Sequence, residues 1–138
     1  MPSLGKYILI VLCAIIVTSC SKSYYDMTPR QFESFINSCG KVHLIDVRTA
    51  KEYNSGHIEG AINIPVSDEI AFWESIDSLQ GKRLFAVYCH GGVRSSHAAI
   101  LLSTQGGYTV YNLEGGIVAW NKKRLPLILP PTIKNDNK

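Results

Sequence analysis

Hydrophobic and polar residues follow two alternating patterns along this chain. Short apolar runs bounded by turn residues predict buried strands, and apolar residues spaced three and four apart predict helices that bury one face. Four strands are expected: residues 42–47, 61–64, 84–88 and 108–111. Five helices are expected around them, starting after Thr28, Thr49 and Ser67, at Ser95, and after Gly116.

Capping residues mark the starts of the first three helices. Thr28 with Gln31, and Thr49 with Glu52, have the spacing of capping boxes, and Pro29 suits a first helical position. Ser67 is expected to cap the third helix. That helix should run to about residue 79, and it offers the core Ile70, Trp73, Ile76 and Leu79.

Strands that alternate with helices predict an α/β fold with a parallel sheet covered on both faces. In such sheets, ligands bind beyond the carboxyl ends of the strands. Arg48 and Cys89 each follow the end of a predicted strand. We therefore look for the site near these two residues.

The stretch from Tyr88 to Ser95 carries the chemistry. Cys89 ends the most apolar strand, and Gly91 and Gly92 let the following backbone curl so that its N–H groups point inward. A curl of this kind in front of a helix forms an anion pocket. Because these dipoles and Arg94 stabilise a thiolate, Cys89 is predicted to be a nucleophile.

The motif Cys-x-x-Gly-x-Arg-Ser from Cys89 to Ser95 resembles the active-site loop of rhodanese-type sulfurtransferases. Three other stretches match this family in order: Asp46-Val47-Arg48 with Glu52-Tyr53, residues 56–65, and Gly115-Gly116-Ile117 with Ala119-Trp120. The resemblance extends over residues 26–127. It implies a five-stranded parallel sheet with helices on both faces. It also implies transfer of a sulfane sulfur, from a donor such as thiosulfate, through a persulfide on Cys89 to a thiophilic acceptor.

The resemblance also suggests roles for the loop residues. The N–H groups from Gly91 to Ser95, including that of Val93, would cradle the charge of the persulfide. Arg94 could hold the anionic donor, or it could fold back and stiffen the loop. His90 could stabilise the thiolate or contact substrate, or it could be an ordinary exposed residue.

Four residues outside the loop are also candidates: Arg48 is grouped with the substrate-binding residues, and Asp46, Glu52 and His57 are structural candidates near the site. Asp46 is expected to satisfy backbone groups or to pair with an arginine. Arg48 and Glu52, four residues apart, could pair with each other, and Arg48 could add positive charge to the pocket. His57, which lies between two turns, is expected to be a packing residue.

Three other functions remain open. Phosphatases and arsenate reductases of related fold use a similar loop with one more residue, whereas four residues separate Cys89 from Arg94 here. A binding or regulatory module without turnover would use the same pocket. Thiol redox chemistry would need Cys39 to reach Cys89, whereas we expect Cys39 to pack at a helix end.

The N-terminus is typical of an exported protein. Lys6 is followed by an apolar run to Val17, and Val17-Thr18-Ser19-Cys20 resembles a bacterial lipobox. We expect residues 1–19 to be a signal peptide and Cys20 to be lipidated, which would hold the protein on a membrane of the cell envelope. The remaining boundaries are a tether at 20–25, the domain at 26–128 and a disordered tail at 129–138.

Composition changes this picture little. The chain has 138 residues, enough for one domain, and a formal charge of +3 that is too scattered to indicate nucleic acid binding. The cysteines have no metal-ligand spacing, so neither metal nor cofactor is expected. We expect a monomer whose partners are a small sulfur-containing anion and a thiol or other nucleophile.

Overall fold

The computed structural model of the chain describes residues 23–79, 81 and 84–131. The predicted signal peptide, the lipidation site at Cys20 and residues 132–138 of the predicted tail lie outside this range. Ten elements follow one another: β1 (Tyr25–Met27), α2 (Pro29–Ser38), β2 (His43–Asp46), α3 (Ala50–Asn54), β3 (Ile62–Asn63), α4 (Glu69–Ser78), β4 (Leu84–Tyr88), α5 (Val93–Thr104), β5 (Thr109–Leu113) and α6 (Gly116–Lys122).

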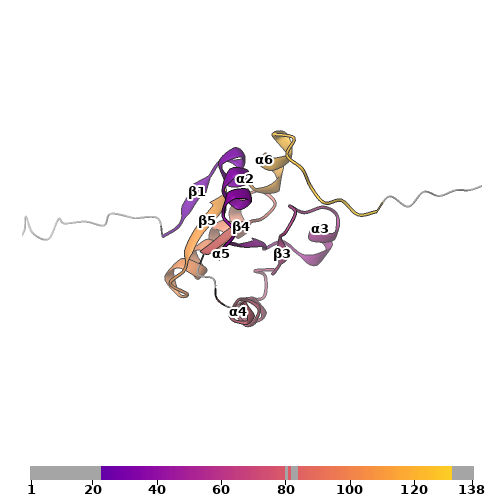
Figure 1. Ribbon diagram of the computed structural model, residues 1–138. Coiled ribbons are helices and arrows are strands. Elements are labelled where there is room, and N and C mark those ends of the chain that lie inside the picture. The colour runs from indigo at the N-terminus through magenta and orange to yellow at the C-terminus, as the bar shows by residue number, and fades with distance from the viewer. Residues whose placement is uncertain (1–22, 80, 82–83, 132–138) are drawn as a thin grey trace, which may run out of the picture.

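The five strands form one parallel sheet in the order β1-β5-β4-β2-β3. β4 is therefore central, with β2 on one side and β5 on the other, and helices lie on both faces (Figure 1). This confirms the predicted α/β fold. Since all strands run the same way, their carboxyl ends meet at one edge of the sheet.

The edge strand β1 has no counterpart among the four strands predicted from the hydrophobic pattern. It pairs with β5, where Tyr25 lies opposite Tyr111 and their rings stack 5.3 Å apart. Three residues with mostly exposed side chains give no periodic signal. Tyr25 was assigned to the tether, but it is the first residue of this strand.

Each face of the sheet has its own core. Ile45 and Val87 point to the face covered by α4 and α5, where Phe72 and Leu102 pack. Leu44 and Ala86, one position earlier in each strand, point to the face covered by α2 and α6, where Phe32, Ile117 and Trp120 pack. α2 and α6 lie above the sheet in Figure 1, with α4 and α5 below it. The site therefore rests on a rigid two-sided scaffold.

Two helices differ in detail from the prediction. Asp68, rather than Ser67, caps α4, and its side chain accepts a hydrogen bond from the Ala71 N–H at 3.1 Å. The buried face of α4 is built from Phe72 and Ile76, one turn apart, so the prediction of Ile70 as a core residue was wrong: its side chain is 76% exposed.

Helix α5 begins at Val93, two residues before the predicted start. The left-handed backbone at Gly92, with φ of 107°, turns the chain directly into the first helical turn. This places Arg94 inside the helix rather than before it.

After α6 the chain returns across the molecule to the turn that follows α3. Ile128 and His57 exchange two backbone hydrogen bonds, of 2.8 and 3.0 Å, and the Trp120 Nε1–H donates to the carbonyl of Pro126. These contacts tie the C-terminal segment to the fold. Within the described residues, no helix has both the length and the apolar character needed to cross a membrane.

Candidate active site

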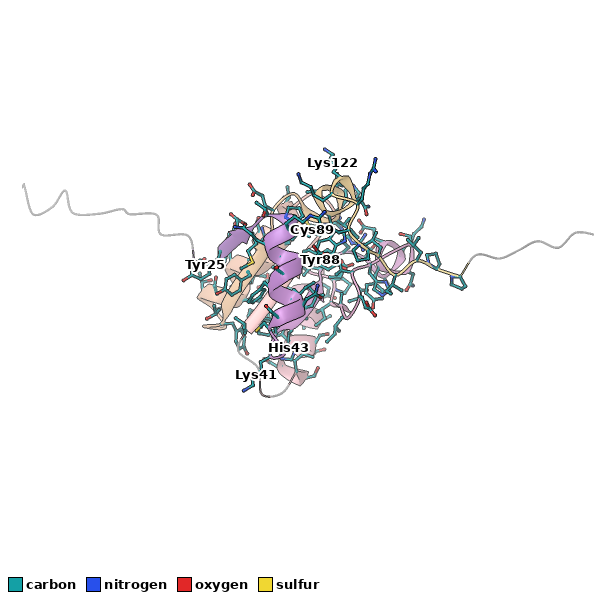
Figure 2. All side chains as sticks on the ribbon, turned by 45° about the horizontal axis from the view of Figure 1, so that its top comes forward. Tyr25, Lys41, His43, Tyr88, Cys89 and Lys122 are labelled. Atoms are coloured by element: carbon teal, nitrogen blue, oxygen red, sulfur yellow. The ribbon has the colours of Figure 1, made fainter. Side chains whose placement is uncertain are left out.

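Cys89 lies directly after β4, at the carboxyl edge of the sheet. Figure 2 places it at the same end of the molecule as Lys122 and away from His43 and Lys41, which lie at the opposite end of the strands. The side chain is buried, with 1% exposure. The thiol is thus held by the central strand in the position where parallel sheets bind ligands.

The sulfur of Cys89 accepts contacts from the loop that follows it. The Gly92 N–H donates to Sγ at 3.0 Å, and the Ser95 hydroxyl lies 3.4 Å from Sγ. Ser95 is fully buried on the first turn of α5. A negative sulfur at this point would therefore face an amide dipole, a hydroxyl and the N-terminus of a 12-residue helix.

Helix α6 fixes the curl of the loop from the other side. The N–H of Ile117 donates to the carbonyl of Cys89 at 2.9 Å, and the N–H of Val118 donates to the carbonyl of His90 at 3.1 Å. Because these two carbonyls are turned toward α6, the loop is free to direct amide hydrogens toward the sulfur. This contact explains the glycine at the start of α6.

Gly116 lies where α6 meets the loop. A Cβ at this position would stand 2.6 Å from the carbonyl oxygen of Cys89 and would also overlap the carbonyl oxygen of His90. The φ angle of Gly116 is +60°, which also favours glycine. The close approach of helix and loop therefore requires glycine at this position.

Arg94 folds back onto α3. Its Nη1 and Nη2 each lie 2.8 Å from an oxygen of Glu52, in a two-pronged ion pair between residues 42 positions apart. The hydrogen bonds from Arg94 hold the pKa of Glu52 far below its ordinary value. The hydrogen bonds that Arg94 donates to Glu52 raise the pKa of Arg94, and the electrostatic attraction of Glu52, Cys89 and Asp46 adds to this rise.

The expected pairing of Arg48 with Glu52 was wrong. Arg48 precedes α3 rather than lying on it, so the two residues do not share a helix face. Arg48 instead binds Asp46 through Nε and Nη2, with Nη2 to Oδ2 at 2.6 Å, and it also donates to the carbonyl of Gly56 at 2.7 Å. The interpretation of Asp46 as the partner of a backbone group and an arginine fits this arrangement.

The pair of Asp46 and Arg48 is buried, with side-chain exposures of 0% and 5%. Burial alone would lower the pKa of Arg48, but the hydrogen bond and charge of Asp46 outweigh it and the pKa is raised. The guanidinium lies 5.7 Å from the ring centre of Tyr88. Arg48 thus neutralises Asp46, which argues against the possibility that it adds positive charge to the pocket.

Tyr88 was not singled out from the sequence as a site residue. Its hydroxyl accepts a hydrogen bond from the N–H of Ile58 at 3.0 Å, and burial raises its pKa well above the ordinary value. The tyrosine that precedes Cys89 thereby ties β4 to the turn that follows α3. Its position next to the cysteine was the available signal.

The remaining predicted residues lie at the rim or outside it. His90 and Gly91 are exposed, and Val93 is 83% exposed at the start of α5. His57 stacks on Tyr53 with ring centres 3.8 Å apart, and its Nδ1 lies 3.0 Å from the carbonyl of Tyr53. The interpretation of His57 as a packing residue agrees with these contacts.

In the described part of the chain, Cys39 and Cys89 are both free thiols. Cys39 is the half-buried cap residue at the C-terminus of α2, and its N–H donates to the carbonyl of Phe35. It therefore packs at a helix end, as predicted.

The family described as the rhodanese-like domain matches residues 28–123. Because this range covers more than half of the chain, the chain belongs to the rhodanese-like domain family.

Individual relatives agree with this assignment. The chain is 39% identical over 100 residues to the probable adenylyltransferase/sulfurtransferase MoeZ of Mycobacterium tuberculosis, a match that covers 72% of this chain but 25% of that protein. It is 36% identical over 81 residues to the thiosulfate sulfurtransferase GlpE of Shewanella oneidensis, covering 59% of this chain and 77% of the relative.

Solved structures agree as well. A rhodanese-related protein from Thermoplasma volcanium superimposes with a TM-score of 0.63 at 30% identity, covering 77% of this chain and 99% of the other. The fold implied by the sequence motifs is therefore the fold of the family.

Proposed function

We propose that this protein is a sulfurtransferase that carries a sulfane sulfur as a persulfide on Cys89. The observation that supports this most directly is the environment of Sγ, which accepts the Gly92 N–H at 3.0 Å within a loop held by α6. Relatives named as sulfurtransferases, at 36% and 39% identity, support the same activity.

In the first half-reaction, the Cys89 thiolate attacks the outer sulfur of a donor, for which we propose thiosulfate. The new bond joins Sγ to the outer sulfur, the sulfur–sulfur bond of thiosulfate breaks, and sulfite leaves with the electron pair. The charge is then carried by the terminal sulfur of the persulfide. The loop amides are preorganised around that charge, which is the arrangement that stabilises an anionic intermediate.

In the second half-reaction, a thiophilic nucleophile attacks the terminal sulfur. The bond between Sγ and the terminal sulfur breaks, and the electron pair returns to Sγ as the thiolate. Cyanide as acceptor gives thiocyanate, and a thiol gives a new persulfide. No oxidant or reductant is consumed in either step.

The role of Arg94 follows from its pairing with Glu52. With both guanidinium prongs bound to the carboxylate, Arg94 sets the end of the loop in place against α3. We propose that it acts as a positioning residue.

Incubation with thiosulfate and cyanide tests the activity. We expect the wild-type protein to form thiocyanate and Cys89→Ser to form none. Cys39→Ser is the matched control, since it removes the other described thiol and should keep full activity. A Cys39→Ser protein without activity would favour thiol redox chemistry, and a wild type that forms no thiocyanate would favour a binding module.

We also propose that the protein is a lipoprotein of the cell envelope, cleaved before Cys20 and acylated on its thiol. The support is the sequence Val17-Thr18-Ser19-Cys20 after an apolar run. Mass analysis of membrane-extracted protein should find acyl groups on Cys20. An intact N-terminus with an unmodified Cys20 would contradict this.

A further inference from the structure

A cavity of about 460 Å³ lies beside the active-site loop, against β1 and β5. Its wall includes Gly92 and Ser96 from the loop and α5, Asn112 and Glu114 from the end of β5, and Asp26 from β1. The volume falls in the range of small-molecule sites. Since the Gly92 N–H also contacts Sγ of Cys89, one loop residue borders both the cavity and the sulfur.

The cavity is acidic. Asp26 and Glu114 both line it, and no lysine, arginine or histidine does so among the described residues. Glu114 is exposed and makes no ion pair with any residue in the described ranges of the chain. A cation in the cavity would therefore meet a carboxylate that the described structure leaves unneutralised.

Asn112 adds a second polar feature at this wall. It is 2% exposed, and its Nδ2 donates to Asp26 Oδ1 at 2.8 Å and lies 3.5 Å from Ser96 Oγ. Both partners line the cavity, so the amide belongs to the cavity wall. Its Oδ1 is buried and accepts no hydrogen bond from the part of the chain that the structure describes. An acceptor of this kind favours a ligand that brings donors.

The opposite side of the loop has different chemistry. There Arg94, on α5, pairs with Glu52, on α3. Helix α3 follows β2 in the chain rather than β5. Because β2 and β5 flank β4 on opposite sides, the ion pair and the acidic cavity lie on opposite sides of the Cys89 loop. The two sides of the loop therefore differ in charge: the side of α3 carries a paired arginine and glutamate, and the side of β5 carries the acidic cavity.

From these observations we infer that the cavity binds the sulfur acceptor, and that this acceptor is a small thiol carrying a positively charged amine. This inference rests on the proposed function and specifies its second half-reaction. The ammonium group lies against Glu114 and Asp26, and a short carbon spacer carries the thiol past Gly92 to the persulfide. The acceptor thiolate then bonds to the terminal sulfur, and the electron pair of the broken bond returns to Sγ.

A binding titration tests the cavity independently of turnover. The probes are 2-(methylthio)ethylamine, which cannot accept sulfur, and the neutral 2-(methylthio)ethanol, added to the isotope-labelled 138-residue chain. We expect saturable NMR shifts at the amides of Gly91, Gly92 and Gly115 with the amine only. Glu114→Gln should weaken this binding about fivefold, the effect of removing one exposed ionic contact. Equal shifts with the alcohol, or unchanged binding by the variant, would overturn the inference.

A transfer assay tests the role of the site. Persulfide-loaded protein is mixed with cysteamine, 2-mercaptoethanol or cyanide, and the rate of sulfur transfer is measured. Each variant is compared with wild type on the same acceptor, so that differences in nucleophilicity between the acceptors cancel. We expect Glu114→Gln to slow cysteamine about fivefold and to leave the other two rates unchanged. Glu74→Gln, an exposed carboxylate on α4, is the matched control and should slow none.

The cyanide reaction and the Glu114→Gln comparison distinguish failure of the acceptor site from failure of the proposed function. If cyanide gives thiocyanate while Glu114→Gln affects all acceptors alike, the acceptor site is wrong and the sulfurtransferase activity stands. If wild type gives no thiocyanate and loads no sulfur, the proposed function fails and the acceptor role of the cavity fails with it.

Discussion

Two ion pairs support the loop at different depths. The pair of Asp46 and Arg48 is buried, whereas the side chains of Glu52 and Arg94 are 32% and 38% exposed. A charge buried without its partner is costly, but an exposed charge is screened by water. The two pairs should therefore differ in how much they contribute to stability.

Asp46→Asn should lower the free energy of unfolding by about 3–5 kcal/mol, because it leaves the guanidinium of Arg48 buried without a counter-charge. Urea unfolding measures this. Glu33→Gln is the control, since it breaks the exposed pair with Arg30, and it should cost no more than about 0.5 kcal/mol. Equal losses in the two variants would contradict the burial argument.

The pair of Glu52 and Arg94 predicts a pH dependence. The pKa of Glu52 is lowered in the folded protein, so its contribution is fully present above the unfolded carboxyl pKa of about 4.3 and is lost as the pH falls through the folded value. We expect Glu52→Gln to destabilise the protein by about 1 kcal/mol, equally at pH 5 and pH 8.

Below about pH 4 the difference between wild type and Glu52→Gln should shrink, because the unfolded wild-type chain then binds a proton at Glu52 that the folded protein does not bind. Chemical denaturation at several pH values measures this difference in the free energy of unfolding. A difference that grows on acidification would show that Glu52 is not ionised in the native protein.

At the scale of elements, the site depends on the contact between α6 and the cysteine loop. Two N–H groups of α6 hold the carbonyls of Cys89 and His90, and Gly116 permits the approach. Helix α6 is in turn anchored in the core by Ile117 and Trp120. The conformation of the loop is therefore linked to a packed helix.

Gly116→Ala should destabilise the protein by about 3 kcal/mol and reduce thiocyanate formation by more than about tenfold, because the added Cβ meets two loop carbonyls at a left-handed position. Thermal unfolding and the thiosulfate assay measure the two effects. Gly40→Ala is the control: its Cβ would meet nothing within 4 Å, so it should stay within about 0.5 kcal/mol of wild type. A stable, active Gly116→Ala protein would refute this role for the contact.

At the scale of the whole molecule, most of the fold could be predicted from the hydrophobic pattern. Long or strongly apolar elements were predicted best. The predicted bounds of β4 are the observed ones, and the predicted start of α5 lies two residues from the observed start. β1 could not be predicted because three edge residues carry no period. Only the family resemblance implied a fifth strand, without saying where it lies.

The candidate site was predictable to a similar extent. A cysteine after a buried strand, two glycines and an arginine were enough to identify the loop. The partner of Arg94 could not be predicted, since it comes from a helix 42 residues earlier and depends on how α3 packs. Sequence rules for neighbouring charges describe one helix face, and Arg48 does not lie on that face.

The most direct test of the account is the mass of the protein after exposure to thiosulfate without an acceptor. We predict that one sulfur atom is added, that peptide mapping places it on Cys89, and that cyanide removes it as thiocyanate. A protein whose Cys89 stays unmodified under these conditions and with other sulfane donors would contradict the central claim.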